Sequence, residues 1–317
     1  MTVNHHLDEL YGLPSFTFPE AGQESAMPEP ETVAWRLSVD VYDSDEEWAQ
    51  VFARFAGAVD LARVRALIVG AWNDAYEKSS KEIVEAIVAA RDRLPALRAL
   101  FLGDMTSEES EISWIIQSDV TPLLESFPGL RWFGVRGGSG LVLPPVRHEA
   151  LETLVVETGG LGAEVVRGIA ASDFPALENL DLWLGSDMYG GDAEPGDLEP
   201  ILAGTRLPSL RYLALRNSVI QDRIAEALAG APVVARLDVL DLSMGTLTDE
   251  GAAALLAGQP LTHLRKLDLH HHYLGADLRA RLRQTLEPAG VELDLDEDDA
   301  ESYEDEDEIH RYIAVAE

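Results

Sequence analysis

Short apolar runs with one internal spacing recur along the chain. Each is a hexamer with apolar residues at its first, fourth and sixth positions, and eight of them lie at residues 64–69, 97–102, 130–135, 151–156, 177–182, 210–215, 237–242 and 264–269. Weaker copies lie at residues 35–41 and 290–295. Alternating apolar residues share one face of an extended chain, so each hexamer predicts a short strand with one buried face.

The segments between the hexamers have the spacing of helices. In residues 79–95, Ile83, Val84, Ile87 and Val88 fall on one stripe, with serines before them and a proline after them. A capping residue, an apolar stripe and a proline in this order predict a helix that begins and ends within the segment. Residues 222–232 and 248–260 repeat the design.

A strand followed by a helix, repeated along the chain, predicts a solenoid. The last apolar residues of successive hexamers lie 21 to 33 residues apart, which leaves room for one return segment in each repeat. Stacked repeats of this kind place a parallel sheet on the concave side and helices on the convex side. We therefore predict an α/β horseshoe with about ten parallel strands.

The hexamers resemble those of leucine-rich-repeat proteins with long, ribonuclease-inhibitor-like repeats, over about residues 33–295. The chain departs from that family three residues after the last apolar residue, where asparagine or cysteine is expected. This place holds Met105, Gly138, Gly159, Gly185, Ser218, Gly245 or His272. More narrowly, the early stretch YGLPSFTFPE and the final RYIAVAE resemble a bacterial leucine-rich-repeat family found near radical-SAM proteins.

The sequence divides into a cap, a solenoid and a tail. In the cap, residues 1–62, we expect Leu13, Phe16, Phe18 and a helix over residues 45–55 to cover the first repeat. Residues 63–295 hold the solenoid, and residues 296–317 form an acidic tail. Residues 294–308 include eleven acids, a run that repels itself and predicts disorder. The final RYIAVAE alternates in polarity, so it is expected to dock on the sheet edge or to act as a handle for a partner.

Composition narrows the function. The 317 residues include no cysteine, which excludes disulfides and thiolate metal sites, and no run of 18 apolar residues. The first ten residues lack the basic and apolar regions of a secretion signal, so we predict a soluble, cytoplasmic protein. The net charge of −33 disfavours nucleic acid and anionic membranes, and it favours a partner with basic groups. The oligomeric state is left open.

The concave positions carry the candidate binding residues. Side chains between the apolar positions of each hexamer, and the residue after it, face the concave side. Aromatic residues and arginine, which dominate binding energy at interfaces, occur there as Phe101, Trp132, Arg136, Trp183, Tyr212 and Arg216. An acidic ladder follows, made of Asp181, Asp241, Asp268 and Glu292, with Asp294 beyond it. Like charges on adjacent strands repel, so we expect a lysine or arginine of a partner to relieve them.

Three histidines, His270, His271 and His272, follow the last hexamer. Successive strand residues face opposite sides, so the three cannot bind one metal ion. The best metal set that the pattern offers is His270 with Asp241, Asp268 and Glu292, which would suit zinc or a hard cation. We favour the alternative, in which His270 is a surface residue and His272 caps the backbone of a turn.

These patterns predict a non-enzymatic scaffold that binds a protein or peptide on its concave face without a cofactor. Two alternatives stay open. The narrower resemblance implies an accessory or substrate protein of a radical-SAM-associated peptide-modification pathway. The histidine cluster would instead indicate a metal-dependent enzyme with its site near His270.

Overall fold

The hexamers become the strands of a single curved sheet. The computed structural model describes residues 3–23, 26–41, 46–297, 300–305 and 308–317. Within them, twelve strands join in chain order: β1 Glu9–Leu10, β2 Leu13–Thr17, β3 Ala34–Leu37, β4 Ala66–Val69, β5 Ala99–Leu102, β6 Trp132–Arg136, β7 Thr153–Glu157, β8 Asn179–Gly185, β9 Tyr212–Ser218, β10 Val239–Asp241, β11 Lys266–Asp268 and β12 Glu292–Asp294. The strands β2 to β12 are parallel, and β1 folds back antiparallel on β2. The predicted parallel sheet of about ten strands is confirmed.

The hexamers also fix the register of the sheet. Their fourth residues pair from strand to strand in one row, which is Leu67, Leu100, Phe133, Leu154, Leu180, Leu213, Leu240, Leu267 and Leu293. One of our side-chain assignments is wrong at the last strand. Asp294, and not Glu292, pairs with Asp268. Glu292 lies two residues earlier, in the row of Lys266.

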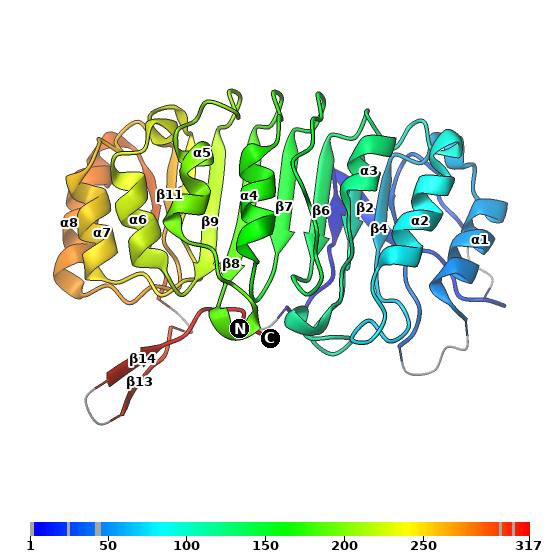
Figure 1. Cartoon of the computed structure of the whole chain (residues 1–317), viewed down its shortest axis with the longest axis horizontal. Coiled ribbons are helices and arrows are strands. Elements are labelled where there is room, and N and C mark those ends of the chain that lie inside the picture. Colours follow the sequence, from blue (N-terminus) through cyan, green and yellow to red (C-terminus); the bar gives the residue numbers. More distant parts are fainter. Residues whose placement is uncertain (1–2, 24–25, 42–45, 298–299, 306–307) are drawn as a thin grey trace.

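The segments with helical spacing cover the convex face of the sheet (Figure 1). The helices are α1 Trp48–Ala58, α2 Lys81–Ala89, α3 Thr121–Ser126, α4 Ala163–Ala171, α5 Glu199–Leu202, α6 Gln221–Ala229, α7 Asp249–Ala257 and α8 Ala276–Leu286. Ser80 precedes α2 as predicted, and the Thr248 side chain caps α7 by accepting from the Glu250 amide. None of the helices in the described residues has the length and apolar character needed to cross a bilayer.

The main core lies between the sheet and the helices. Leu67, Leu100 and Phe133 are buried there together with Ile83, Val84 and the other inward residues of the helices. Burial of each large aliphatic side chain contributes about 1.5–3 kcal/mol, so the repeated leucines are the main source of stability. The shortest repeat, between β6 and β7, has no room for a helix and returns through the irregular segment 137–152.

The cap joins the same sheet through β2 and β3. Phe16 and Phe18 pack edge-on against Trp35, with ring centroids 5.4 and 6.4 Å apart, and Phe18 also meets Phe55 of α1 at 5.4 Å. These two phenylalanines therefore cover the first repeat as predicted. Leu13 does not, because it packs on the concave side instead. The predicted helix over residues 45–55 is α1, and residue 45 lies outside the described residues.

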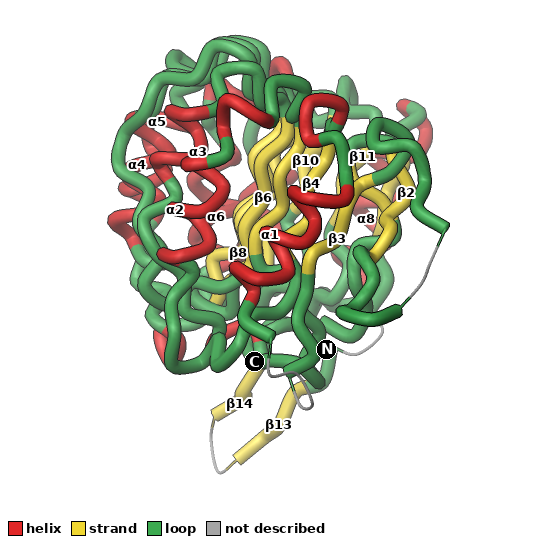
Figure 2. Tube along the Cα trace, turned by 90° about the vertical axis from the view of Figure 1, so that its right-hand side faces the viewer, coloured by secondary structure: helices red, strands yellow, loops and turns green. Residues whose placement is uncertain are grey.

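The acidic tail contains an antiparallel hairpin, formed by β13 Ser302–Asp305 and β14 Glu308–Arg311. The prediction of disorder is therefore wrong for the five hairpin residues that belong to the acidic run, 302–305 and 308. The hairpin projects from the body of the solenoid, beside the edge at which both chain ends lie (Figures 1 and 2). Beyond it, Ile313, Ala314 and Val315 return to the solenoid and are buried, so the final segment docks on the ends of the strands. Three consecutive residues are buried there, and not the alternate ones that its polarity predicts.

Candidate functional site

The N-terminal segment covers the first part of the concave face. Apart from Arg36, the side chains of β3, β4 and β5 that face away from the helices are small or apolar, and they form a second buried cluster made of Ala34, Ala66, Ile68, Ala99 and Phe101. Leu10 is buried within this cluster, and Leu7, Tyr11 and Leu13 pack against it. Because of this cover, Phe101 is 0% exposed. The expectation that Phe101 is an open anchor for a partner is therefore wrong.

Gly134 leaves the space that the Phe101 ring occupies above β6. A Cβ atom at Gly134 would approach Cδ2 of Phe101 to 2.5 Å and the ring of Trp132 to 2.6 Å. The missing side chain lets the two rings meet above the glycine, with centroids 5.9 Å apart. Trp132 closes the edge of this cluster and stays partly exposed toward the centre of the concave face.

Asp104 binds the N-terminal segment to the strand ends. Its fully buried carboxylate accepts from Nε of Arg36 at 2.8 Å, from the Leu7 amide at 3.1 Å and from Arg136 at 3.4 Å. Arg136 also donates to Glu157 at 2.7 Å and to the Met105 carbonyl at 2.7 Å. The guanidinium of Arg136 is thus held within the chain, and its position does not support our expectation that it is a partner-binding residue.

The contact between His6 and Asp104 shifts the pKa of both groups. The hydrogen bond to Asp104 raises the pKa of His6 above its usual value, although partial burial opposes this. Burial alone would raise the pKa of Asp104, but the hydrogen bond from His6 and the charges of Arg36 and Arg136 outweigh burial and lower it. The histidine ring also lies 3.5 Å from Glu109, a second acid that favours the charged ring.

This pair predicts a pH dependence in the attachment of the N-terminal segment. The raised pKa of His6 means that its stabilising effect is fully present below pH 6.5 and is lost as the pH rises through the folded-state pKa. His6 is partly exposed, so the effect should be about 1 kcal/mol or less. We expect His6→Gln to be less stable than the wild type at pH 6 and equal to it at pH 9, in urea unfolding at both values. A difference that grows with pH would contradict the assignment.

The final segment crosses the same carboxyl ends of the strands, farther along the solenoid, at the ends of β9, β10 and β11. Ala314 and Val315 pack with Ile112, Trp183 and Met244 in a third apolar cluster. Trp183 is 8% exposed, and the guanidinium of Arg216 lies 5.1 Å from its ring centroid. Trp183 therefore contacts this chain's own tail, and the prediction that it is an open anchor is wrong.

Arg216 neutralises the first two rungs of the acidic ladder. It donates two hydrogen bonds to Asp181, at 3.0 and 2.6 Å, and lies 3.6 Å from Asp241. Asp241 also accepts from the Ser243 hydroxyl at 2.6 Å and from the Tyr212 hydroxyl at 3.1 Å. Burial raises the pKa of Asp181 to about 6, and the negative charge of Asp241 raises it further. The positive charge of Arg216 and its hydrogen bond act in the opposite direction. The ladder is thus relieved from within, and it does not require a partner's lysine or arginine at this point.

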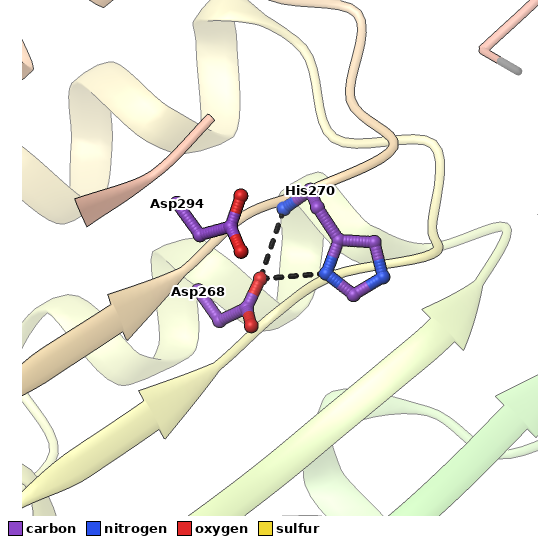
Figure 3. Close-up of side chains that lie close together, drawn as sticks. All are labelled: Asp268, His270 and Asp294. Carbon is purple, nitrogen blue, oxygen red and sulfur yellow. Dashed lines mark hydrogen bonds and ion pairs between the residues drawn. The ribbon is translucent and has the colours of Figure 1, made fainter. Parts of the chain in front are cut away.

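The predicted metal set is only partly brought together. Asp268, His270 and Asp294 have ligand atoms within 4.8 Å of one another, and this is the group that the described residues offer (Figure 3). The expected members Asp241 and Glu292 are not part of it. Asp241 is hydrogen-bonded to Tyr212, and Glu292 lies in the row of Lys266, two residues before Asp294. Nδ1 of His270 donates to the Asp268 carboxylate at 2.7 Å.

Lys266 supplies a cation to this cluster. Its ammonium lies 2.9 Å from Asp268 and 3.7 Å from Asp294. Burial would raise the pKa of Asp268, but the hydrogen bonds from His270 and Lys266 hold it well below its usual range. The hydrogen bond to Asp268 in turn raises the pKa of His270, which favours a charged ring and not a metal ligand. The geometry thus favours an ion-pair network at these residues over a metal centre.

His271 and His272 serve the backbone. His272 is buried at the place where leucine-rich repeats favour asparagine, and its two ring nitrogens contact the Leu295 carbonyl at 3.3 Å and the Leu274 amide at 3.1 Å. This confirms the interpretation of His272 as a cap of the turn. His271 contacts the Tyr312 carbonyl at 3.0 Å and so belongs to the docking of the tail, which the sequence did not indicate.

A row of four side chains at the centre of the concave face is partly open. Trp132, Thr153, Asn179 and Tyr212 pair from strand to strand across β6, β7, β8 and β9, and each is partly exposed. We call this set the concave row. Successive strands lie about 4.8 Å apart, so the two aromatic rings flank two hydrogen-bonding side chains over about 14 Å. Lys266 continues the same row two strands beyond Tyr212 and is also partly exposed.

Comparison with known proteins agrees with this architecture. A family model for the leucine-rich repeat matches residues 206–229 and 237–256. A crystal structure of a Bacteroides fragilis protein, determined by the Northeast Structural Genomics Consortium, aligns with a TM-score of 0.77 and 26% identity, over 86% of this chain and 76% of that one. The chain is a leucine-rich-repeat solenoid.

The remaining comparisons add little to this assignment. An internalin, inlF, from Listeria monocytogenes aligns with a TM-score of 0.35 and 13% identity, over 74% of the solenoid protein and 54% of the internalin. That similarity is too low to support an argument about function. No curated protein matches the sequence. The association of the solenoid with radical-SAM proteins stays a prediction.

Proposed function

We propose that the solenoid is a non-enzymatic scaffold that binds a protein partner on its concave face. The leucine-rich-repeat fold is typical of such scaffolds, because its strands align side chains from many repeats on one continuous surface. The observation that carries the proposal is the concave row, in which Trp132 and Tyr212 stay partly exposed while neighbouring aromatic residues are covered. Tryptophan and tyrosine are the residue types most enriched among strong interface contacts.

The charge of the chain favours a basic partner. The net charge of −33 attracts cationic proteins over distances of about a Debye length and raises their association rate. Glu292 is exposed at the end of the concave row, and Glu157 is partly exposed near its centre. We place the partner's apolar contacts over Trp132 and Tyr212 and its basic groups at these acids.

The test is affinity capture from the source organism with the wild type and the double variant Trp132→Ala, Tyr212→Ala. We expect the recovery of the specific partner to fall at least about tenfold, since each strong contact contributes about 2 kcal/mol or more. The matched control is Trp114→Ala, Tyr76→Ala, which removes one tryptophan and one tyrosine that are each 56% exposed away from the concave row. Equal recovery by the two double variants would refute the assignment of the surface.

A further inference from the structure

A row of strand-end residues carries backbone strain. Asn217, Met244 and His271 each stand two residues after the last apolar residue of their hexamers, at the ends of β9, β10 and β11. All three have positive φ angles, of 52°, 64° and 54°. A residue other than glycine costs about 1 kcal/mol or more in this conformation. Such strain concentrates at functional sites.

Each of these three residues contacts the backbone of the final segment, residues 312–317. His271 contacts the Tyr312 carbonyl at 3.0 Å, and the Met244 carbonyl accepts from the Ala314 amide at 2.8 Å. Asn217 makes two contacts with Val315, donating to its carbonyl at 2.6 Å and accepting from its amide at 2.9 Å. A side-chain amide that bonds both groups of one residue reproduces the pairing that a neighbouring strand would give.

We call the surface that holds residues 312–317 the groove. It continues past β8 to the loop before α3. The Ser113 hydroxyl donates to the Ala316 carbonyl at 2.5 Å, and the Tyr189 hydroxyl donates to the Glu317 side chain. Gly159 leaves the space for this part of the segment, because a Cβ atom there would lie 2.0 Å from the Ala316 carbonyl oxygen. The backbone of the segment is thus bound at three successive repeats, by His271, Met244 and Asn217, and again by Ser113 in the loop that follows β5.

The side-chain contacts of the groove are small and apolar. Ala314 and Val315 are 2% and 3% exposed, against Ile112, Trp183 and Met244. Most of the specific hydrogen bonds go to the backbone of the segment, which any peptide possesses. The groove therefore selects an extended peptide by shape, with small aliphatic side chains at two adjacent positions and an acid after them.

We propose that this groove is a peptide-binding site and that residues 312–317 occupy it as an internal ligand. Its occupant in trans is an extended peptide of a partner protein with the same chemistry, Ile-Ala-Val-Ala-Glu or a close equivalent. The internal segment competes at the high effective concentration of a tethered ligand, so the site is open to a partner only when that segment is displaced. The groove uses none of the concave row, so its failure would leave the proposed function unaffected.

The main experiment uses the full chain with the substitutions Ala314→Asp and Val315→Asp, which place carboxylates against Trp183 and expel the segment. Binding of a fluorescein-labelled peptide with the sequence of residues 309–317 is followed by anisotropy. We expect the substituted chain to bind this peptide at least about tenfold more tightly than the wild type, in which the internal segment competes. Adding Asn217→Ala to the substituted chain should abolish binding, and a peptide with the same two aspartates should not bind.

A second measurement leaves the backbone contacts of the segment and its buried side chains Ala314 and Val315 intact, and removes only the bond from Tyr189 to Glu317. The chain has no cysteine, so Glu317→Cys provides a unique position for an environment-sensitive dye. Excess unlabelled peptide should change the dye signal as it displaces the segment, and the Asn217→Ala chain should show the displaced signal without peptide. A folded Ala314→Asp, Val315→Asp chain that binds no peptide, or a dye signal that peptide does not alter, would overturn the proposal. A wild-type dimer that these two substitutions abolish would make the occupant a second copy and would also overturn it.

Discussion

Replacing Asp104 by alanine should lower the free energy of unfolding by about 3–5 kcal/mol. The carboxylate is fully buried and lies between the guanidinium groups of Arg36 and Arg136, whose side chains are 9% and 4% exposed. Without it, two buried positive charges remain close together with less compensation, and the Leu7 amide loses its acceptor. The change should appear as a lower urea midpoint and as faster proteolysis of the N-terminal segment.

Glu152→Ala is the matched control for Asp104→Ala. Glu152 forms an ion pair with Arg131, but the two side chains are 34% and 47% exposed, so the loss should stay within about 1 kcal/mol. If both variants lose the same small amount, Asp104 does not organise the buried ion cluster. If Asp104→Ala loses stability but its N-terminal segment stays protected from proteolysis, the apolar contacts of Leu7 and Leu10 suffice to hold that segment.

Replacing Phe101 by alanine should lower the free energy of unfolding by about 3–5 kcal/mol, as for other fully buried aromatic residues. The ring fills the space between the concave side of β5, the cover of Leu10 and the backbone of Gly134. Alanine would leave a cavity there, because the sheet below and the ion cluster of Asp104 beside it restrict any collapse. Urea or thermal unfolding measures the loss.

Trp132→Ala separates a role in stability from a role in binding. Trp132 touches Phe101 but is partly exposed, so its removal should cost about 1–2 kcal/mol and should reduce partner capture more strongly than stability. Phe101→Ala should show the reverse order. A Phe101→Ala variant that unfolds like the wild type but loses the partner would restore the view of Phe101 as an anchor.

Both ends of the chain converge on the carboxyl edge of the sheet. The N-terminal segment is held at Asp104, and the final segment at Asn217, Met244 and His271. Val3 packs against the apolar cluster that contains Ala314 and Val315, so the two segments meet near the centre of that edge. This arrangement leaves the concave row as the central open surface among the sequence-predicted sites.

The acidic ladder illustrates how a correct pattern can give a wrong expectation. The sequence places Asp181, Asp241 and Asp268 in one concave row, and the structure confirms this row, with Ala214 between the first two. Their cations, however, come from the same sheet: Arg216 lies on the strand between those of Asp181 and Asp241, and Lys266 lies on the strand of Asp268. Those pairs depend on the rotamers of long side chains, which periodicity does not specify. The balance of charge within the chain therefore follows from the tertiary structure and not from the periodicity.

The sequence by itself determined the strands that the hexamers form, their order and their register. The reason is local, since the alternation in each hexamer defines a buried face and the leucines can be buried only if successive hexamers stack in phase. The concave positions of β3 to β5 held a signal that our prediction of Phe101 as an open anchor did not use, because Ala34, Ala66, Ile68, Ala99 and Phe101 together are too apolar to face water.

Only the tertiary structure decided which concave residues are open and which are covered. Leu10 meets Phe101, and Asn217 binds Val315, across separations of about ninety and ninety-eight residues. The repeat pattern of the sequence does not relate residues that lie so far apart in the chain. Whether they make contact depends on where the curvature of the solenoid places the two ends of the chain. The repeats therefore specify the frame, and the two terminal segments, folded back along its edge, specify the surface that a partner can reach.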